Sequence, residues 1–306
     1  MSSTRPVFTG TSGLNTKVDP VRLPVSEGAQ VFLSSCLNVD VDDTGRLSRR
    51  KGFTLAQSGS WHSLFPCSGY LLGVKSDGLF KFNGATSTGL RNVTTGRRMS
   101  YTKAFDGKRE VIYYANGAEV GKVYADDGLS HTVAVATYVG PTTSRVFTGM
   151  PIGEHICVWN GRMYVSNREA LWYSERIDFE SYRLAKNNVS FPNRVNMLIP
   201  LEAGLMIGTA GNILLMSGPN PDEWAYRELA QYGAIEWTDK KATKTPITVN
   251  GAIHHNAWLF GTQEGMCAVT EDGQFENKSE NFISYPSAIR GGAGIFNGKY
   301  IMNLEG

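Results

Sequence analysis

Residues 36–53, CLNVDVDDTGRLSRRKGF, alternate apolar and polar side chains up to a turn and then run back as a second segment. Leu37, Val39 and Val41 alternate with polar residues, which is the period of a strand with one buried face. Asp43-Thr44-Gly45 supplies turn chemistry, because Asp bonds its own backbone and Gly adopts positive φ without a Cβ clash. We therefore predict a β-hairpin here. Since an isolated hairpin is marginally stable in water, it needs a larger sheet to join.

The composition is that of a globular protein. Of 306 residues, 41% are hydrophobic and 19% are charged, and 34 glycines with 11% aromatics suit many short strands and tight turns. A net charge of +2 does not indicate a protein that coats nucleic acid. The first thirty residues lack the basic and apolar regions of a signal peptide, and no apolar run approaches the ~18–20 residues that span a bilayer, so we expect no membrane insertion.

A unit of apolar strand, polar turn and apolar strand recurs along the chain after the hairpin. Its first strands are predicted at residues 70–74, 111–114, 163–165, 205–208, 258–261 and 300–302. Between positions 71, 112, 164, 206, 259 and 301 the intervals are 41, 52, 42, 53 and 42 residues. A period of roughly 40–50 residues with about four strands is typical of a β-propeller. The two long intervals indicate insertions near residues 126–153 and 219–246.

A second repeat supports the first. Ser174 and Ser217 are 43 residues apart, and so are Glu180 and Glu223, and each pair marks a turn followed by an aromatic segment. We predict strands at 180–184 and 223–227. For residues 221–231 the alternative is a short helix, because Pro, Asp and Glu suit its start and Gly233 its end.

Six repeats predict six blades. Residues 288–295 and 299–304 supply two strands near the C-terminus, and the N-terminal hairpin supplies two more. We expect these four strands to form one blade, which would remove the exposed sheet edges. The predicted fold is therefore all-β: a six-bladed β-propeller over residues 31–306, its last blade completed by N-terminal strands, preceded by an extended N-terminal arm over residues 1–30.

The arm carries the candidate subunit-interface residues. Pro6, Pro20 and Pro24 oppose a helix and disfavour a central strand. The apolar residues that such an arm would bury against a neighbouring subunit are Leu14, Val18, Val21 and Leu23. The alternative is simple terminal disorder.

The densest basic cluster lies on the return strand of the hairpin. It consists of Arg46, Arg49, Arg50 and Lys51. These residues are candidates for contact with a DNA channel or a partner protein. The alternative is a solvated strand that pairs with acidic side chains.

Metal and cofactor sites are not indicated. Asp40, Asp42 and Thr44 resemble the start of a calcium loop, but the twelfth position is Lys51 rather than the required Glu. Adjacent His254 and His255 would point to opposite faces of a strand. The four cysteines are far apart in sequence, so we expect free buried thiols.

An enzyme is not expected either. The carboxylates available for glycosidase chemistry lie in predicted turns, where they occur for ordinary reasons. No repeated Ser-x-Asp-x-Gly-x-x-Trp box, Gly-x-Ser-x-Gly elbow or phosphate loop is present. A hydrolase remains the minor alternative.

Three stretches together resemble a known family. They are Gly13-Leu14-Asn15 at the start of the Pro-containing arm, the hairpin over residues 37–53, and Trp172-Tyr173-Ser174-Glu175 before an aromatic segment. The combination resembles virion structural proteins of tailed bacteriophages, in particular the propeller-containing tail nozzle, hub and DNA-stabilisation proteins of short-tailed phages. The likeness is strongest over residues 10–60 and 160–230. Such proteins are usually longer, with platform domains for which this chain has no room.

The resemblance implies a non-enzymatic component of a phage tail or head–tail connector. Copies of the chain would form a ring around the DNA exit channel and contact portal, adaptor or other tail proteins through the arm and loops, with non-specific contact to viral DNA. The expected location is the virion tail, assembled in the host cytoplasm. The alternative is a propeller on the virion surface that binds glycans or a receptor through exposed aromatic residues.

Overall fold

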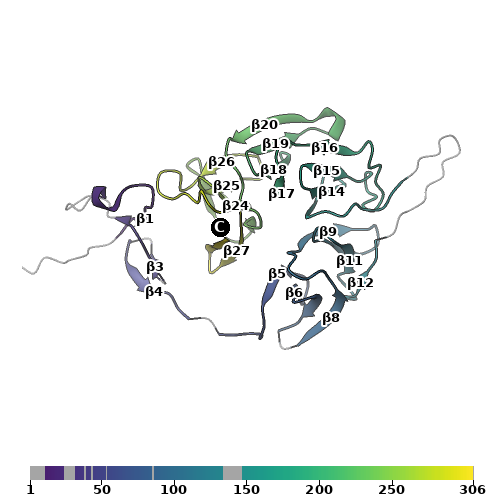
Figure 1. Cartoon of the computed structure of the whole chain (residues 1–306), viewed down its shortest axis with the longest axis horizontal. Coiled ribbons are helices and arrows are strands. Elements are labelled where there is room, and N and C mark those ends of the chain that lie inside the picture. Colours follow the sequence, from purple (N-terminus) through teal and green to yellow (C-terminus); the bar gives the residue numbers. More distant parts are fainter. Residues whose placement is uncertain are drawn as a thin grey trace, which may run out of the picture.

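The computed structural model describes residues 11–23, 32–37, 39–42, 44–52, 54–84, 86–133 and 147–305. Within these ranges the chain is all-β, as predicted, and its helical segments are the 3-10 turns η1 (Pro20–Arg22) and η2 (Pro221–Glu223). Five four-stranded antiparallel sheets follow one another around an arc (Figure 1). We call these sheets blades 1–5 in chain order.

The strands of each blade follow one another in sequence, except in blade 5. Blade 1 contains β5 (Trp61–Pro66), β6 (Leu71–Lys75), β7 (Gly78–Phe82) and β8 (Ser87–Asn92). Blade 2 contains β9 (Ser100–Phe105), β10 (Glu110–Ala115), β11 (Val120–Tyr124) and β12 (Ser130–His131). Blade 3 contains β13 (His155–Trp159), β14 (Arg162–Asn167), β15 (Ala170–Tyr173) and β16 (Asn188–Ser190). Blade 4 contains β17 (Val195–Pro200), β18 (Leu205–Thr209), β19 (Ile213–Ser217) and β20 (Ala225–Ala230).

Blade 5 interrupts this order with a small hairpin. Its sheet contains β21 (Lys240–Ala242), β24 (Ala257–Thr262), β25 (Gly265–Val269) and β26 (Phe275–Asn277), while β22 (Ile247–Val249) and β23 (Ala252–His254) pair only with each other. The last two strands, β27 (Arg290–Phe296) and β28 (Lys299–Glu305), form a separate two-stranded sheet that we call the C-terminal hairpin.

The sequence repeat corresponds to one position in the sheets. The predicted first strands at residues 71, 112, 164, 206 and 259 are β6, β10, β14, β18 and β24, each the second strand of its blade, and residue 301 lies in β28. The strand that follows each one in the repeat pairs with it antiparallel, for example Leu72 with Lys81 and Tyr164 with Tyr173. The predicted period therefore marks successive blades.

The central strands of blades 2–4 are buried on both faces, one against the preceding blade and one against the next. In β10, Ile112 and Tyr114 join a buried cluster with blade 1, whereas Val111, Tyr113 and Ala115 join a cluster with blade 3. This alternation is the period of two that a strand dictates. It explains why the central strands are almost continuously apolar.

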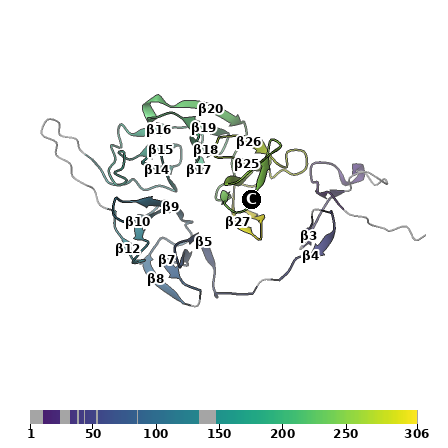
Figure 2. The same ribbon diagram turned by 180° about the vertical axis from the view of Figure 1, so that it is seen from behind.

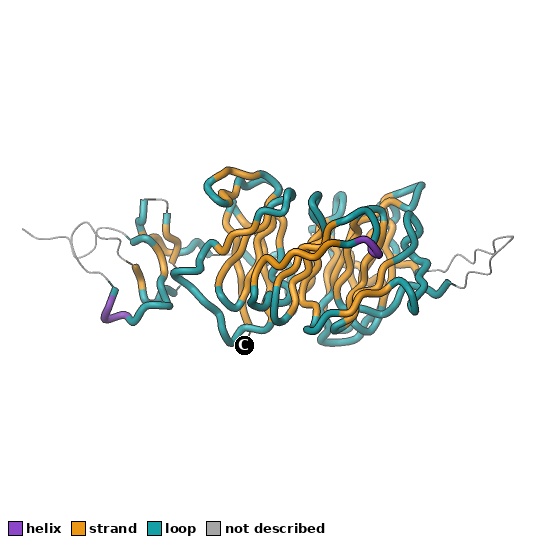
Figure 3. The backbone as a smooth tube through the Cα atoms, turned by 90° about the horizontal axis from the view of Figure 1, so that it is seen from above, coloured by secondary structure: helices purple, strands orange, loops and turns teal. Residues whose placement is uncertain are grey.

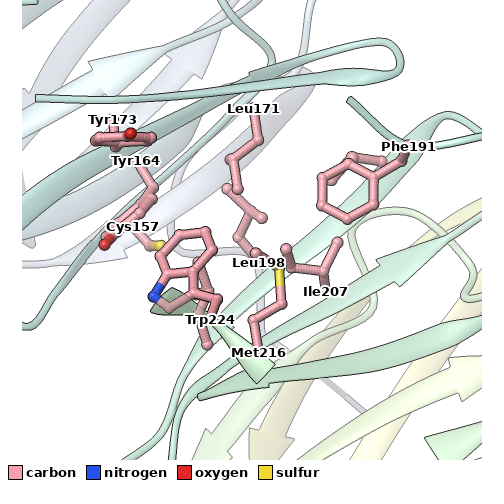
Figure 4. Close-up of a cluster of buried hydrophobic side chains, with 11 residues drawn as sticks. Cys157, Tyr164, Leu171, Tyr173, Phe191, Leu198, Ile207, Met216 and Trp224 are labelled. Atoms are coloured by element: carbon pink, nitrogen blue, oxygen red, sulfur yellow. The ribbon is translucent and has the colours of Figure 1, made fainter. Parts of the chain in front are cut away.

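The cluster between blades 3 and 4 shows this packing (Figure 4). Tyr164 and Leu171 from blade 3 meet Ile207 and Met216 from blade 4, with Trp224 closing one side. Complete burial of such a side chain contributes roughly 1.5–3 kcal/mol. Viewed from above, the strands of successive blades stand side by side across the thickness of the molecule (Figure 3).

The C-terminal hairpin packs on blade 5 but not on blade 1. Tyr300 lies against the buried residues Val249, Leu259 and Ala268, and its hydroxyl donates to the carbonyl of Thr238 at 2.6 Å. On the other side, a Cβ built on Gly294 would meet no atom within 4 Å. No buried apolar cluster joins this hairpin to blade 1 in the described residues, so the arc has a seam there.

Residues 11–52, as far as they are described, form what we call the N-terminal unit. It contains β1 (Gly13–Leu14), paired in parallel with β2 (Phe32–Leu33), and the predicted hairpin, β3 (Val39–Val41) with β4 (Leu47–Arg49). The amide of Thr11 donates to the carbonyl of Gly45 at 2.9 Å, which ties the two pieces together. The unit lies beside blade 5, at the rim of the arc (Figure 2).

The predicted completion of the last blade is not present in the structure. β3–β4 and β27–β28 are separate two-stranded sheets, so five blades are four-stranded and the sixth position holds a hairpin alone. An ion pair of 3.5 Å between Lys299 and Asp40 links the two hairpins. The N-terminal unit is held at blade 5 instead, because Thr16 donates to the carbonyl of Phe282 and the rings of Phe32 and Phe282 stack at 5.1 Å.

The extended arm over residues 1–30 can be followed only in part. Residues 1–10 and 24–30 lie outside the described residues, and the described part holds β1 and η1. The division between arm and propeller at residue 30 therefore stays a prediction.

Two local predictions need correction, and a third is confirmed in part for both of its alternatives. Residues 180–184 form no strand; Tyr182 makes isolated bridges to Thr148 and Ser174 and is fully buried between blades 2 and 3. Residues 221–231 contain both alternatives, η2 followed by β20. The second insertion, predicted near residues 219–246, lies further along the chain, because β20 is a regular outer strand and the extra hairpin β22–β23 begins at Ile247. The first insertion, predicted near residues 126–153, falls between β12 and β13, and its residues 134–146 lie outside the described ranges.

Candidate functional site

The first strands that Figure 1 labels, β5, β9 and β17, lie on the inner side of the arc, and charged residues precede the first strands of blades 2–5. Strand β9 contacts β13, β13 contacts β17, and β21 contacts β27. At or shortly before the starts of β9, β13, β17, β21 and β27 the chain places Arg98, Glu154, Arg194, Glu236 and Arg290. We call these five residues, with Glu305 at the end of β28, the inner charge cluster.

The inner charge cluster alternates in sign and links neighbouring blades. Arg194 lies 2.9 Å from Glu154 of blade 3 and 3.3 Å from Glu236, which precedes blade 5. Glu305 accepts from Arg98 at 2.9 Å through one oxygen and from Arg290 at 2.9 Å through the other. Ion pairs within the cluster therefore connect neighbouring blades near the starts of their first strands.

The most buried member of the cluster is Glu236. Its carboxylate lies 3.1 Å from Nε2 of His155, and the two side chains are 12% and 6% exposed. Burial raises the pKa of Glu236, but the hydrogen bond and charge of His155 and the charges of Arg194 and Arg290 outweigh it and hold the pKa below its ordinary value. The His155 ring also packs on Trp237, with ring centroids 4.6 Å apart. This arrangement suits a structural ion pair.

Arg98 makes contacts across the seam. Its guanidinium donates to the carbonyl of Gly291 in β27 and to the carboxylate of Glu305 in β28, while Arg98 itself lies between blades 1 and 2. A Cβ on Gly292 would lie 3.3 Å from the same guanidinium. Polar contacts thus hold the C-terminal hairpin at a side where apolar packing is missing.

A cleft of about 520 Å³ opens next to the inner charge cluster, between blades 2 and 3. It is lined by Arg97, Gly117, Glu154, Asn167, Arg168, Glu169, Ala170, Trp172 and Ser190. These residues come from the β8–β9 and β12–β13 connections, the β10–β11 and β14–β15 turns, and the last three strands of blade 3. The cleft is therefore built where strand-connecting turns meet.

The candidate subunit-interface residues lie in the N-terminal unit. Leu14 is half-buried in β1, opposite Leu33, and Leu23 is half-buried after η1. Val18 is exposed, and Val21 is 90% exposed. Their role at a subunit interface stays a prediction.

The basic cluster of Arg46, Arg49, Arg50 and Lys51 is exposed on the hairpin β3–β4. Arg50 approaches Asp40 at 3.7 Å, which is the kind of solvated pairing that the alternative interpretation expects. In the turn, one oxygen of Asp42 accepts from the amide and hydroxyl of Thr44 and from the amide of Arg46, and these bonds lower its pKa. Asp42 therefore stabilises the turn of the hairpin.

Among the described residues no group of three or more His, Cys, Asp and Glu side chains could hold a metal ion. The cysteines are unpaired, but Cys36 is exposed and Cys67 half-buried, so the expected burial holds only for Cys157 and Cys267. Burial raises the pKa of the Cys267 thiol to about 11. None of the helices in the described ranges is long and apolar enough to span a bilayer.

Sequence reasoning missed the inner charge cluster and the cleft. The signal was available, because positions 98, 154, 194, 236 and 290 are separated by 56, 40, 42 and 54 residues, which follows the blade period. A single charged residue before a strand does not indicate a site. Only the recurrence of charged residues at the blade period identifies the inner charge cluster.

No protein-family model and no curated protein matches the chain. Solved structures with a similar arrangement include the extracellular domain of the hybrid two component system BT4673 from B. thetaiotaomicron, at 11% identity and a TM-score of 0.45 over 77% of this chain and 30% of that chain. A second is BBS1N in complex with ARL6DN, with 12% sequence identity and a TM-score of 0.44 over 87% of this chain and 85% of that chain. A third is Trypanosoma rangeli sialidase in complex with sialic acid, with 10% sequence identity and a TM-score of 0.30 over 87% of this chain and 56% of that chain. This chain spans less than a third of the BT4673 domain. Likeness at this level does not extend to function, and the propeller-type description rests on the five blades themselves.

Proposed function

We propose that this chain is a non-enzymatic structural component of a phage tail or head–tail connector, assembling into a ring of copies through its N-terminal unit and loops. The support from sequence is the resemblance over residues 10–60 and 160–230. The support from structure is that His155 and Glu236 form a buried ion pair of the kind that holds blades together. Such a protein acts through surfaces.

One observation carries the proposal: the two most exposed large hydrophobic side chains of the described chain lie in the same unit, outside the arc of blades. Leu37 is 91% exposed and Val21 is 90% exposed. Exposed apolar side chains gathered on one projecting unit suit a contact with another protein. The exposed arginines of β3–β4 add charge to the same unit.

Deleting residues 1–30 tests the assembly role. We expect the truncated chain to retain the β-rich circular dichroism spectrum and the cooperative thermal unfolding of the blades, because blades 1–5 pack through their own clusters. We expect it to be missing from assembled particles. Incorporation at the level of the full chain would contradict the proposal.

We further propose that the arc of blades within one chain closes into a six-bladed propeller, with the hairpin β3–β4 pairing with the free edge of β28. Three features support this. The outer edge of β28 pairs with no strand among the described residues, a lone hairpin is marginal, and Asp40 already contacts Lys299. The apolar residues Val39, Val41 and Leu47 share one face of the hairpin and are only half-buried.

Hydrogen exchange tests this closure. In the full chain we expect the amides of β28 that point away from β27 to be protected, because β3 would accept from them. A Val41→Pro variant should lose that protection while blade 4 exchanges as before. If the outward amides of β28 exchange at unprotected rates in the full chain, the sixth blade is not formed.

A further inference from the structure

The cleft between blades 2 and 3 has a rigid rim. The carbonyl of Arg168 accepts from the amide of Val195 at 2.8 Å, and the carbonyl of Glu169 accepts from Phe191 at 2.8 Å. Across the cleft, the amide of Gly117 donates to the carbonyl of Gly153 at 2.7 Å. The turn positions are therefore fixed before any ligand arrives, which lowers the entropic cost of binding.

Small residues keep the cleft open. Gly117 has a φ of +82°, and a Cβ there would lie 3.0 Å from Cγ of Glu154 and 3.4 Å from Nη1 of Arg97. Ala170 occupies a second lining position. The resulting space of about 520 Å³ falls within the roughly 300–1,000 Å³ typical of small-molecule sites.

The arginines around the cleft differ in their partners. Arg98, Arg194 and Arg290 each form an ion pair with a carboxylate of the inner charge cluster. Arg97 and Arg168, the two arginines that line the cleft, form no ion pair within the described part of the chain, and both are exposed. Glu154 has an ion pair with Arg194, whereas Arg97 and Arg168 have none in the described part of the chain. The cleft therefore offers two exposed guanidinium groups to an anion.

The remaining lining groups suit a sugar ring. Trp172 is half-buried and gives an apolar wall against which the C–H face of a pyranose can pack. Asn167 is held by its bond to the carbonyl of Ile152 at 3.2 Å, so its amide oxygen is free to accept from a hydroxyl. Ser190 supplies a further donor and acceptor.

From these features we infer that the cleft binds a carboxylate-bearing sugar, with Arg97 and Arg168 on the carboxylate and Trp172 against the ring. This site is separate from the exposed apolar residues of the N-terminal unit that carry the proposed assembly contact, since its residues lie in blades 2 and 3 and in the connections that lead into them. Charge-assisted bonds from guanidinium to carboxylate are roughly twice as strong as neutral hydrogen bonds. The acidic group is therefore the main source of affinity.

Calorimetric titration with D-glucuronate and D-glucose tests the inference, because these sugars differ only in the carboxylate at C6. On the full chain at fixed salt we expect glucuronate to bind at least tenfold more tightly than glucose. The double variant Arg97→Gln, Arg168→Gln should lose at least tenfold in glucuronate affinity. Arg176→Gln, a matched change of an exposed arginine outside the cleft, should stay within twofold of the unchanged protein.

Three outcomes would overturn the inference: equal affinity for the two sugars, undiminished binding by the double variant, or displacement of glucuronate by sodium sulfate at equal concentration, which would indicate an unspecific anion site. Both arginines are exposed, so the variants are expected to fold, and an unchanged melting temperature verifies this. Assembly of the double variant should match that of the unchanged chain, which separates this result from the proposed function.

Discussion

Replacing Phe260 by alanine is expected to lower the free energy of unfolding by ~3–5 kcal/mol, the range for deleting a buried aromatic ring. Phe260 is 0% exposed in β24 and lies in the cluster between blades 4 and 5. Its neighbours come from two sheets, for example Met197 of blade 4 and Val269 of blade 5, so the cavity cannot close by a local shift. Chemical denaturation followed by tryptophan fluorescence measures the loss.

Phe282→Ala is the matched control. This ring is 37% exposed and stacks on Phe32 at the rim of blade 5, outside the clusters between blades. Because this ring is only partly buried and its removal opens no cavity between blades, the control should cost less than the Phe260 change. Equal losses from the two variants would contradict the assignment of the core to the interfaces between blades.

Glu236→Ala is expected to cost ~3–5 kcal/mol, because it leaves His155 buried without its carboxylate partner. It also removes one of the two carboxylates on Arg194. Glu236→Gln keeps an oxygen that accepts from His155 and removes only the charge, so it should lose less than half as much. If both variants unfold like the unchanged protein, the inner charge cluster does not hold the blades.

The same pair predicts a pH dependence. The pKa of Glu236 is lower in the folded chain than its ordinary value of 4.5. The stabilisation from this group is therefore complete above that ordinary value and is lost as the pH falls through the folded pKa. Denaturation curves recorded from pH 6 down to pH 3 should show a smaller loss of stability in Glu236→Gln than in the unchanged protein. Parallel pH profiles would argue against the shift.

The repeat could be predicted because it depends on burial alone. A strand with both faces covered needs an apolar residue at every position, and segments such as 205–208 are recognisable for that reason. The first strands of the blades were harder to find, since β21 and β13 begin with the polar residues Lys240 and His155. The strand predicted at 180–184 failed because Tyr182 serves as a core side chain on irregular backbone.

The site could not be predicted by local reasoning. Arg98 and Glu305 are 207 residues apart, and only the curvature of the arc brings them to 2.9 Å. The same holds for His155 and Glu236, whose side chains come from different blades. The hairpin was predicted correctly, but its docking was not, because apolar alternation identifies a buried face without identifying the sheet that covers it.

Native mass spectrometry of the full chain, beside Val21→Asp, tests the assembly role most directly. Val21 is 90% exposed, so the substitution places a charge at the proposed contact without entering the fold. The account predicts discrete oligomers at micromolar concentration for the unchanged chain, monomers for Val21→Asp, and oligomers for Ile177→Asp, a matched change of an exposed residue on blade 3. A monomeric unchanged chain, or oligomers that persist in Val21→Asp, would contradict it.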